Sequence, residues 1–146
     1  MLRLLITSAV VSAMVTGVAR SAPVEAYVYD RQLGLVARAS LSQAAPTRTL
    51  KDVLRVYVPC YRDRHAFEST YERRSGESAR WVVAYYAGRG DVHLRNGTCV
   101  GVHEFFEGRR TVYTAGAYSI LLHEALHRQG LRNERMTTCL AIDAVR

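Results

Sequence analysis

Lysine is almost absent from this chain of 146 residues: Lys51 is the only one, and the other 19 of its 20 lysine and arginine residues are arginine. Dense basic patches are missing as well, because only two arginine pairs are adjacent in the sequence. The formal net charge is +7, but a nucleic-acid surface would normally show a basic patch with interleaved aromatic residues. We therefore interpret the positive charge as a solvated surface and expect no nucleic-acid partner.

Several sequence signatures are also missing. The chain has no internal repeat, no low-complexity tract, and no GxSxG, Walker or Rossmann pattern, which argues against serine hydrolases and nucleotide-binding enzymes. Hydrophobic residues make up 49% and charged residues 23% of the chain, which indicates a globular protein. The length allows one domain.

Residues 1–22 have the pattern of a signal peptide. Arg3 gives a short positive start, an apolar run extends from Leu4 to Val18, and small residues follow at cleavage spacing, with a second cleavage frame at Val24–Ala26. The run is shorter than the roughly 20 residues that span a bilayer. We therefore expect a secreted or cell-envelope protein with no stable membrane span after cleavage. An uncleaved membrane anchor is the alternative.

The rest of the chain predicts an α+β fold. A poorly patterned lead-in at 23–50, with room for a short helix, precedes a domain at 51–146. The expected elements are a strand at 53–58, a helix at 61–74, a buried strand at 81–87, a hairpin at 91–102 around Asn96–Gly97, and helices at 109–129 and 133–145. This order favours a small, mostly antiparallel twisted sheet packed on the first of these two C-terminal helices.

Three cysteines are present, without CxxC spacing, so a cysteine zinc site is unsupported. A two-residue turn in the expected hairpin would pair residue 94 with Cys99 and direct both toward the core. Cys60 ends a neighbouring strand candidate. In an oxidising compartment we therefore expect a Cys60–Cys99 disulfide, which leaves Cys139 unpaired.

The chemical centre of the sequence is His123-Glu124-Ala125-Leu126-His127, an HExxH pattern. Four residues on a helix turn about 400°, so the two histidines point the same way, one turn apart. Such a pair can bind zinc, and Glu124 lies about 100° from His123, within reach of a water molecule at the metal. We therefore expect Zn²⁺ at His123 and His127, with Glu124 as the catalytic base.

Over about Ile120 to Ala141, the sequence resembles the zincin metallopeptidases. That resemblance implies a twisted sheet above the motif helix, with one edge strand that binds substrate. The metzincin pattern would need a histidine where this chain has Asn133. The stretch Asn133-Glu134-Arg135-Met136-Thr137-Thr138 resembles the NExxSD stretch of the gluzincins, and the spacing from Glu134 to Ala141 resembles small bacterial and phage metallopeptidases. The resemblance implies Glu134 as the third zinc ligand. Arg128 and Thr138 depart from the family pattern.

Geometry limits how Glu134 can reach the metal. It lies seven residues after His127, about 10.5 Å along one unbroken helix, whereas zinc bonds are about 2 Å long. We therefore predict a break at about 129–132, where Gly130 ends the first helix and Asn133 caps the second. Asp143 is a poor substitute, because it points about 180° away from Glu134 on the second helix.

These patterns predict a zinc-dependent hydrolase, specifically a peptidase that acts on a peptide or protein substrate. One alternative is a secreted protein with a non-catalytic zinc site, and another is a basic secreted binding module without metal. His93 and His103 are candidates for stabilising an oxyanion if the hairpin forms the edge strand, although packing roles are favoured for both.

Overall fold

The computed structural model describes residues 26–44, 55–88 and 90–146, and the signal-like segment lies outside them. The described elements are β1 (Tyr27–Tyr29), α1 (Arg31–Ala44), β2 (Pro59–Tyr61), α2 (Arg64–Ser75), β3 (Ala84–Tyr86), β4 (Val92–Arg95), α3 (Asn96–Phe106), α4 (Val112–Arg128) and α5 (Glu134–Asp143). The fold is α+β, as expected. Within the described ranges, no helix is both long and apolar enough to cross a membrane.

The four strands form one mixed sheet in the order β1-β2-β4-β3. The two outer pairings, β1 with β2 and β3 with β4, are antiparallel, while the central pairing of β2 with β4 is parallel. The long connection through α2 and β3 makes the parallel pairing possible. The expectation of a mostly antiparallel sheet is therefore correct at both edges and wrong at the centre.

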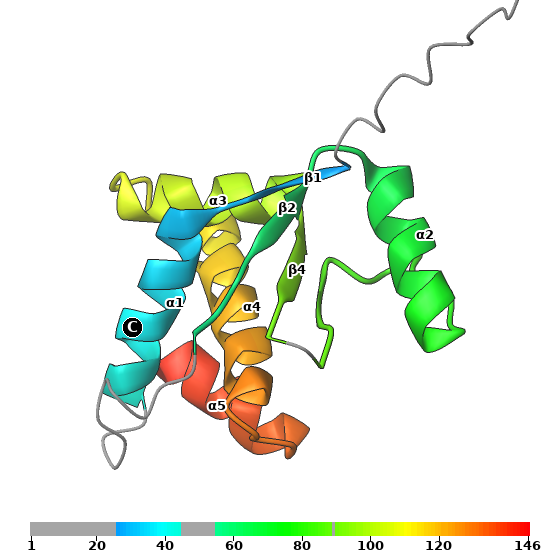
Figure 1. Ribbon diagram of the computed structural model, residues 1–146. Helices are drawn as coiled ribbons and strands as arrows, with labels where there is room; N and C mark the ends of the chain where they lie inside the picture. The colour runs from blue at the N-terminus through cyan, green and yellow to red at the C-terminus, as the bar shows by residue number, and fades with distance from the viewer. Residues whose placement is uncertain (1–25, 45–54, 89) are drawn as a thin grey trace, which may run out of the picture.

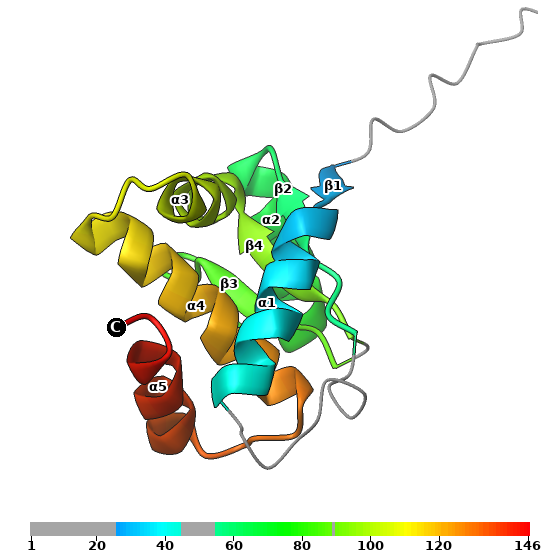
Figure 2. The same ribbon diagram turned by 90° about the vertical axis from the view of Figure 1, so that its left-hand side faces the viewer.

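The sheet separates two apolar clusters of different size. Figure 1 shows α1 and α4 on one side of the sheet and α2 on the other. Alternate residues of β4 point to opposite faces of the sheet. Val92 and Leu94 belong to the larger cluster, with residues of α1, α3 and α4. His93 packs against Tyr85, which belongs to the smaller cluster under α2. Figure 2 shows α5 beside the C-terminal half of α4, to which a short loop joins it.

The second half of the expected hairpin is wrong, because α3 begins at Asn96, directly after β4. Buried residues at Thr98, Cys99, Val102 and Phe105 follow helical spacing, which a five-residue window did not distinguish from strand alternation. Gly101 permits the packing that this helix makes, since a Cβ there would lie 2.7 Å from the Cβ of Ala117 on α4.

The strands also differ from the expected ranges. β2 lies at 59–61, so it begins at the proline that was expected to end a strand at 53–58; residues 53 and 54 lie outside the described ranges. Proline is compatible with the first position of a strand, because it need not donate a ladder hydrogen bond there. The strand expected at 81–87 is confined to 84–86, and Trp81 is 82% exposed.

The lead-in contains more structure than its composition indicated. β1 pairs with β2, and α1 is a helix of 14 residues. Leu33, Ala37 and Leu41 lie at successive four-residue steps on α1 and are fully buried in the larger cluster. This part of the lead-in is therefore integral to the folded core.

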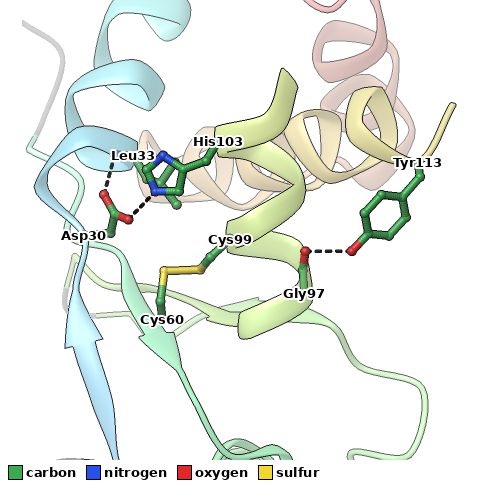
Figure 3. Close-up of a disulfide and its surroundings, with 7 residues drawn as sticks. All are labelled: Asp30, Leu33, Cys60, Gly97, Cys99, His103 and Tyr113. Carbon is green, nitrogen blue, oxygen red and sulfur yellow. Dashed lines mark hydrogen bonds and ion pairs between the residues drawn. A yellow bond between two sulfur atoms is a disulfide. The ribbon is translucent and has the colours of Figure 1, made fainter. Parts of the chain in front are cut away.

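A disulfide joins Cys60 on β2 to Cys99 on α3, which confirms the expected pairing (Figure 3). The scaffold differs from the expected hairpin: Cys60 is the register partner of Leu94, and α3 then turns back over the sheet. Cys139 is free and exposed. Further along α3, Nε2 of His103 donates to Oδ2 of Asp30 at 2.6 Å, so a second link ties α3 to the start of α1.

Candidate metal centre

Helix α4 places His123 and His127 on one face. The helix begins with a capping box between Thr111 and Thr114 and runs without interruption to Arg128. Buried leucine and alanine residues around the motif hold α4 against the core, so its histidine face lies along the boundary of the fold. The two imidazole rings lie 4.7 Å apart between centroids, and their Nε2 atoms are 3.0 Å apart.

The chain breaks between the histidine pair and the candidate third ligand, Glu134. α4 ends at Arg128, Gly130 has φ +89°, and α5 starts at Glu134 with the Asn133 side chain accepting a hydrogen bond from the Met136 N–H. The predicted break at 129–132 and the Asn133 cap are therefore confirmed. Gly130 serves here because the left-handed conformation costs a residue with a Cβ more than it costs glycine.

The break returns the Glu134 carboxylate to the histidine pair. Oε2 lies 3.1 Å from Nε2 of His123, and Oε1 lies 3.2 Å from Nε2 of His127. A tetrahedral ion with bonds of about 2.0–2.1 Å needs ligand atoms about 3.3 Å apart. These separations, together with the 3.0 Å between the two nitrogens, are therefore close to those of a preformed metal site. Among the described residues, these three form the one group with suitable ligand atoms.

Hydrogen bonds behind the histidines set their orientation. Nδ1 of His127 lies 2.6 Å from the Leu131 carbonyl oxygen, which can only accept, so the proton of the neutral ring belongs on Nδ1. The Nε2 lone pair then faces His123 and Glu134. Nδ1 of His123 lies 3.4 Å from the Thr138 hydroxyl oxygen. Thr138 therefore occupies the place of the orienting partner, with a hydroxyl in place of a carboxylate.

The electrostatics of the site favour the neutral form of His123. Burial lowers the pKa of His123, and the adjacent His127 lowers it further, although the Glu134 carboxylate opposes both effects. Neutral imidazole is the form that binds a metal ion. The side chains of His123 and His127 are 22% and 17% exposed, whereas that of Glu134 is 73% exposed, so the group opens to solvent on the α5 side.

Glu124 lies beside this group without joining it. Burial raises the pKa of its carboxyl, against the opposing effects of His127 and of a hydrogen bond from the Tyr86 backbone N–H. The nearby Glu134 carboxylate raises this pKa further. Glu124 is thus a half-buried carboxylate with an elevated pKa, held toward β3 by a main-chain donor, which is the environment of a general base.

A groove runs between β3 and α4 past these residues. On one side of the centre is an apolar cavity of about 420 Å³ that includes Trp81, Val83 and Ile120. On the other side is a cavity of about 630 Å³ that includes Tyr86 and Arg128. Both cavities include His123 and Glu124, so the candidate centre lies between them.

The β3 strand presents to the groove a main-chain edge that no described strand covers. The Val83 carbonyl accepts from Arg95, and the Ala87 N–H donates to Asp91, so the odd-numbered peptide groups face β4. The peptide groups of Ala84 and Tyr86 then point away from β4. The Tyr86 N–H donates to Glu124, and no described strand pairs with that edge. Such an edge can hydrogen-bond an extended peptide.

The remaining histidine candidates do not reach the centre. His93 is 2% exposed under α2, and His103 bonds Asp30 on the α1 side of the fold, so neither lines the groove. Sequence reasoning missed the Leu131 carbonyl and the Tyr86 N–H, because main-chain groups carry no residue-type signal. Comparison of the chain with protein-family models, curated proteins and solved structures found no match.

Proposed function

We propose that the chain is a zinc-dependent peptidase in which His123, His127 and Glu134 hold the metal and Glu124 is the general base. The observation that carries the proposal is the convergence of three ligand side chains from two helices next to a carboxylate with a raised pKa. A set of two histidines and one glutamate is a common catalytic zinc set. The motif pattern and the turn at Gly130 support the same assignment.

Each residue has a definite task in this proposal. When bound, zinc would supply Lewis acidity, which polarises a substrate carbonyl and lowers the pKa of a water molecule toward neutral pH. The Glu124 carboxylate takes a proton from that water, whose oxygen bonds to the carbonyl carbon of the scissile peptide. Glu124 then gives the proton to the amine nitrogen as the C–N bond breaks. The Ala84 N–H and the carbonyl groups of Ala84 and Tyr86 orient the substrate backbone along β3.

A non-catalytic zinc site that joins α4 to α5 is the second candidate, since its ligands come from both helices. Structural zinc sites usually have four protein ligands, whereas catalytic sites keep one position open. The candidate group has three members among the described residues, which favours catalysis. The base beside it has no task in a purely structural site.

We also propose export to the cell envelope or beyond. The signal-like pattern at 1–22 supports it, and so does the Cys60–Cys99 disulfide, because disulfides persist in oxidising compartments.

The test combines metal analysis with digestion of casein and a peptide library. Wild type should bind one zinc ion per chain, and His127→Ala should lose it. Glu124→Gln should keep the zinc while its kcat falls about 100- to 10,000-fold, the usual contribution of a general base. Glu107→Gln, an exposed carboxylate at the end of α3, is the matched control and should keep full activity. Full activity in Glu124→Gln would refute the mechanism. A wild-type chain that binds no zinc would refute both zinc proposals and favour the alternative of a binding module without metal.

A further inference from the structure

Arg128 is the last residue of α4 and lines the larger cavity of the groove next to His127. Its Nε atom is buried and has no hydrogen-bond partner among the described residues. Within the same ranges, no carboxylate lies within ion-pair distance of its guanidinium group, whose charge acts on Asp91 only at longer range; five pairs of an arginine with a carboxylate exist elsewhere in the described chain. A partly buried cation normally has a partner, so this one requires an explanation.

The absence of a contact with Glu124 is informative. Glu124 lies four residues before Arg128 on the same helix, the spacing at which glutamate and arginine usually meet. The guanidinium group lies instead against the turn between β3 and β4, where a Cβ on Gly90 would be 3.2 Å from Nε and 3.4 Å from Nη2. Arg128 therefore does not neutralise the proposed base.

Charge in this half of the groove favours an anionic ligand. Arg128 and Arg132 are the cations in the lining, and Glu124 and Glu134 are the anions. Two positive and two negative side chains balance, so a bound zinc ion would leave an excess of positive charge. A favourable helix-dipole interaction accounts for a cation at the C-terminus of α4, but not for one whose Nε is buried without a partner.

We propose that Arg128 is a specificity-determining residue that binds a carboxylate of the peptide substrate on the Tyr86 side of the metal centre. The inference rests on the proposed peptidase function for its choice of ligand. A guanidinium group matches a carboxylate with two parallel hydrogen bonds. The carboxylate belongs either to an acidic side chain or to the C-terminus of the peptide, and the experiment separates these sources.

The experiment measures binding apart from cleavage. The probes are alanine- and leucine-based hexapeptides with Glu or Gln at one position at a time, each made as a C-terminal acid and as an amide. They are titrated into Glu124→Gln protein, with and without zinc. The readout is the fluorescence of Trp81, the single tryptophan, which is exposed and lines the other end of the groove.

At one position, peptides with Glu should bind about 10- to 100-fold more tightly than those with Gln, the range for a hydrogen-bonded charge pair. The preference should persist without zinc. Arg128→Gln in the same background should abolish it, Arg128→Lys should retain part of it, and Arg62→Gln, an exposed arginine outside the groove, should retain all of it. A preference for acid over amide in place of Glu over Gln would identify the C-terminal carboxylate.

Absence of peptide binding, absence of any carboxylate preference, or a preference that survives Arg128→Gln would overturn the inference. The same peptides are then incubated with zinc-loaded wild type. Carboxylate-selective binding without cleavage would refute the peptidase function and leave the carboxylate site standing. Cleavage without selectivity would refute only the role of Arg128.

Discussion

His93 provides a sharp test of the smaller apolar cluster, which supports the groove strand β3. The ring is 2% exposed and stacks on Tyr85 of β3, with centroids 4.5 Å apart and planes 4° apart. Nε2 lies 3.3 Å from Nη1 of Arg74, which can only donate, so the neutral ring carries its proton on Nδ1 and donates it to the Tyr61 hydroxyl at 2.9 Å. A second proton on Nε2 would face the Arg74 cation inside the fold.

Burial lowers the pKa of His93 from 6.5 to about 4, and the Arg74 charge contributes to this shift. Between these two pH values the unfolded chain binds a proton that the folded chain does not, so stability rises with pH through this window. The full contribution is present above pH 6.5 and is lost as pH falls toward 4. Converted at 1.36 kcal/mol per pH unit, the loss is about 3 kcal/mol.

The variant is His93→Gln, whose amide can still meet the Tyr61 hydroxyl but does not titrate. Urea unfolding of wild type and variant between pH 7 and pH 4 gives two stability curves, and other titrating groups cancel in their difference. The wild-type advantage at pH 7 should shrink by about 3 kcal/mol at pH 4. His65→Gln, on the exposed face of α2, should run parallel to wild type. Parallel curves for His93→Gln would refute the buried, neutral assignment, and loss of peptidase activity at pH 7 with an intact fold would restore His93 as an oxyanion candidate.

Two further predictions concern the turn and the disulfide. Gly130→Ala should lower the free energy of unfolding by about 1 to 2 kcal/mol, because φ is +89° there and, with nothing within 4 Å of the new Cβ, only the backbone strain counts. The same change should weaken zinc binding. Gly116→Ala on α4, where the new Cβ also meets nothing within 4 Å, should instead stabilise the protein by about 0.5 to 1 kcal/mol. Equal stability of the two variants in urea would contradict this explanation of the turn. Replacing Cys60 and Cys99 by alanine opens a loop with a sequence separation of 39 and should cost about 4 kcal/mol in the chain-entropy model, while Cys139→Ser should cost little, because that thiol is exposed and unpaired. Thiol titration of wild type should find one free thiol, and three would contradict the pairing.

The candidate centre was predictable because its parts are close in sequence. Helical periodicity puts His123 and His127 on one face. The limited reach of a metal bond then requires a turn before Glu134, and Gly130 is the residue that permits it. Each step uses a local rule, and the structure agrees on the shared histidine face, the turn and the place of Glu134.

The scaffold was less predictable because long-range contacts decide it. The window 98–102 fits a strand and a helix equally well, and the close approach of Gly101 to Ala117 on α4 accompanies the helical choice. The disulfide was predicted correctly, but from a wrong local structure. Cys60 and Cys99 were paired on the assumption of a hairpin, and they meet because β2 and β4 are neighbours in a parallel pairing that the sequence did not reveal.

Arg128 shows why substrate chemistry depends on the fold as well as on the motif. Spacing along α4 alone favours an ion pair between Arg128 and Glu124. That pair would lower the pKa of Glu124 and leave Arg128 unable to bind a substrate carboxylate. The guanidinium group lies instead against the turn at Gly90, and that turn exists because β3 pairs with β4. This long-range pairing thus leaves the main-chain edge of β3 facing the groove and a cation beside it, while burial raises the pKa of Glu124. The HExxH residues define a candidate metal site, and the strand beside them determines what that site can bind.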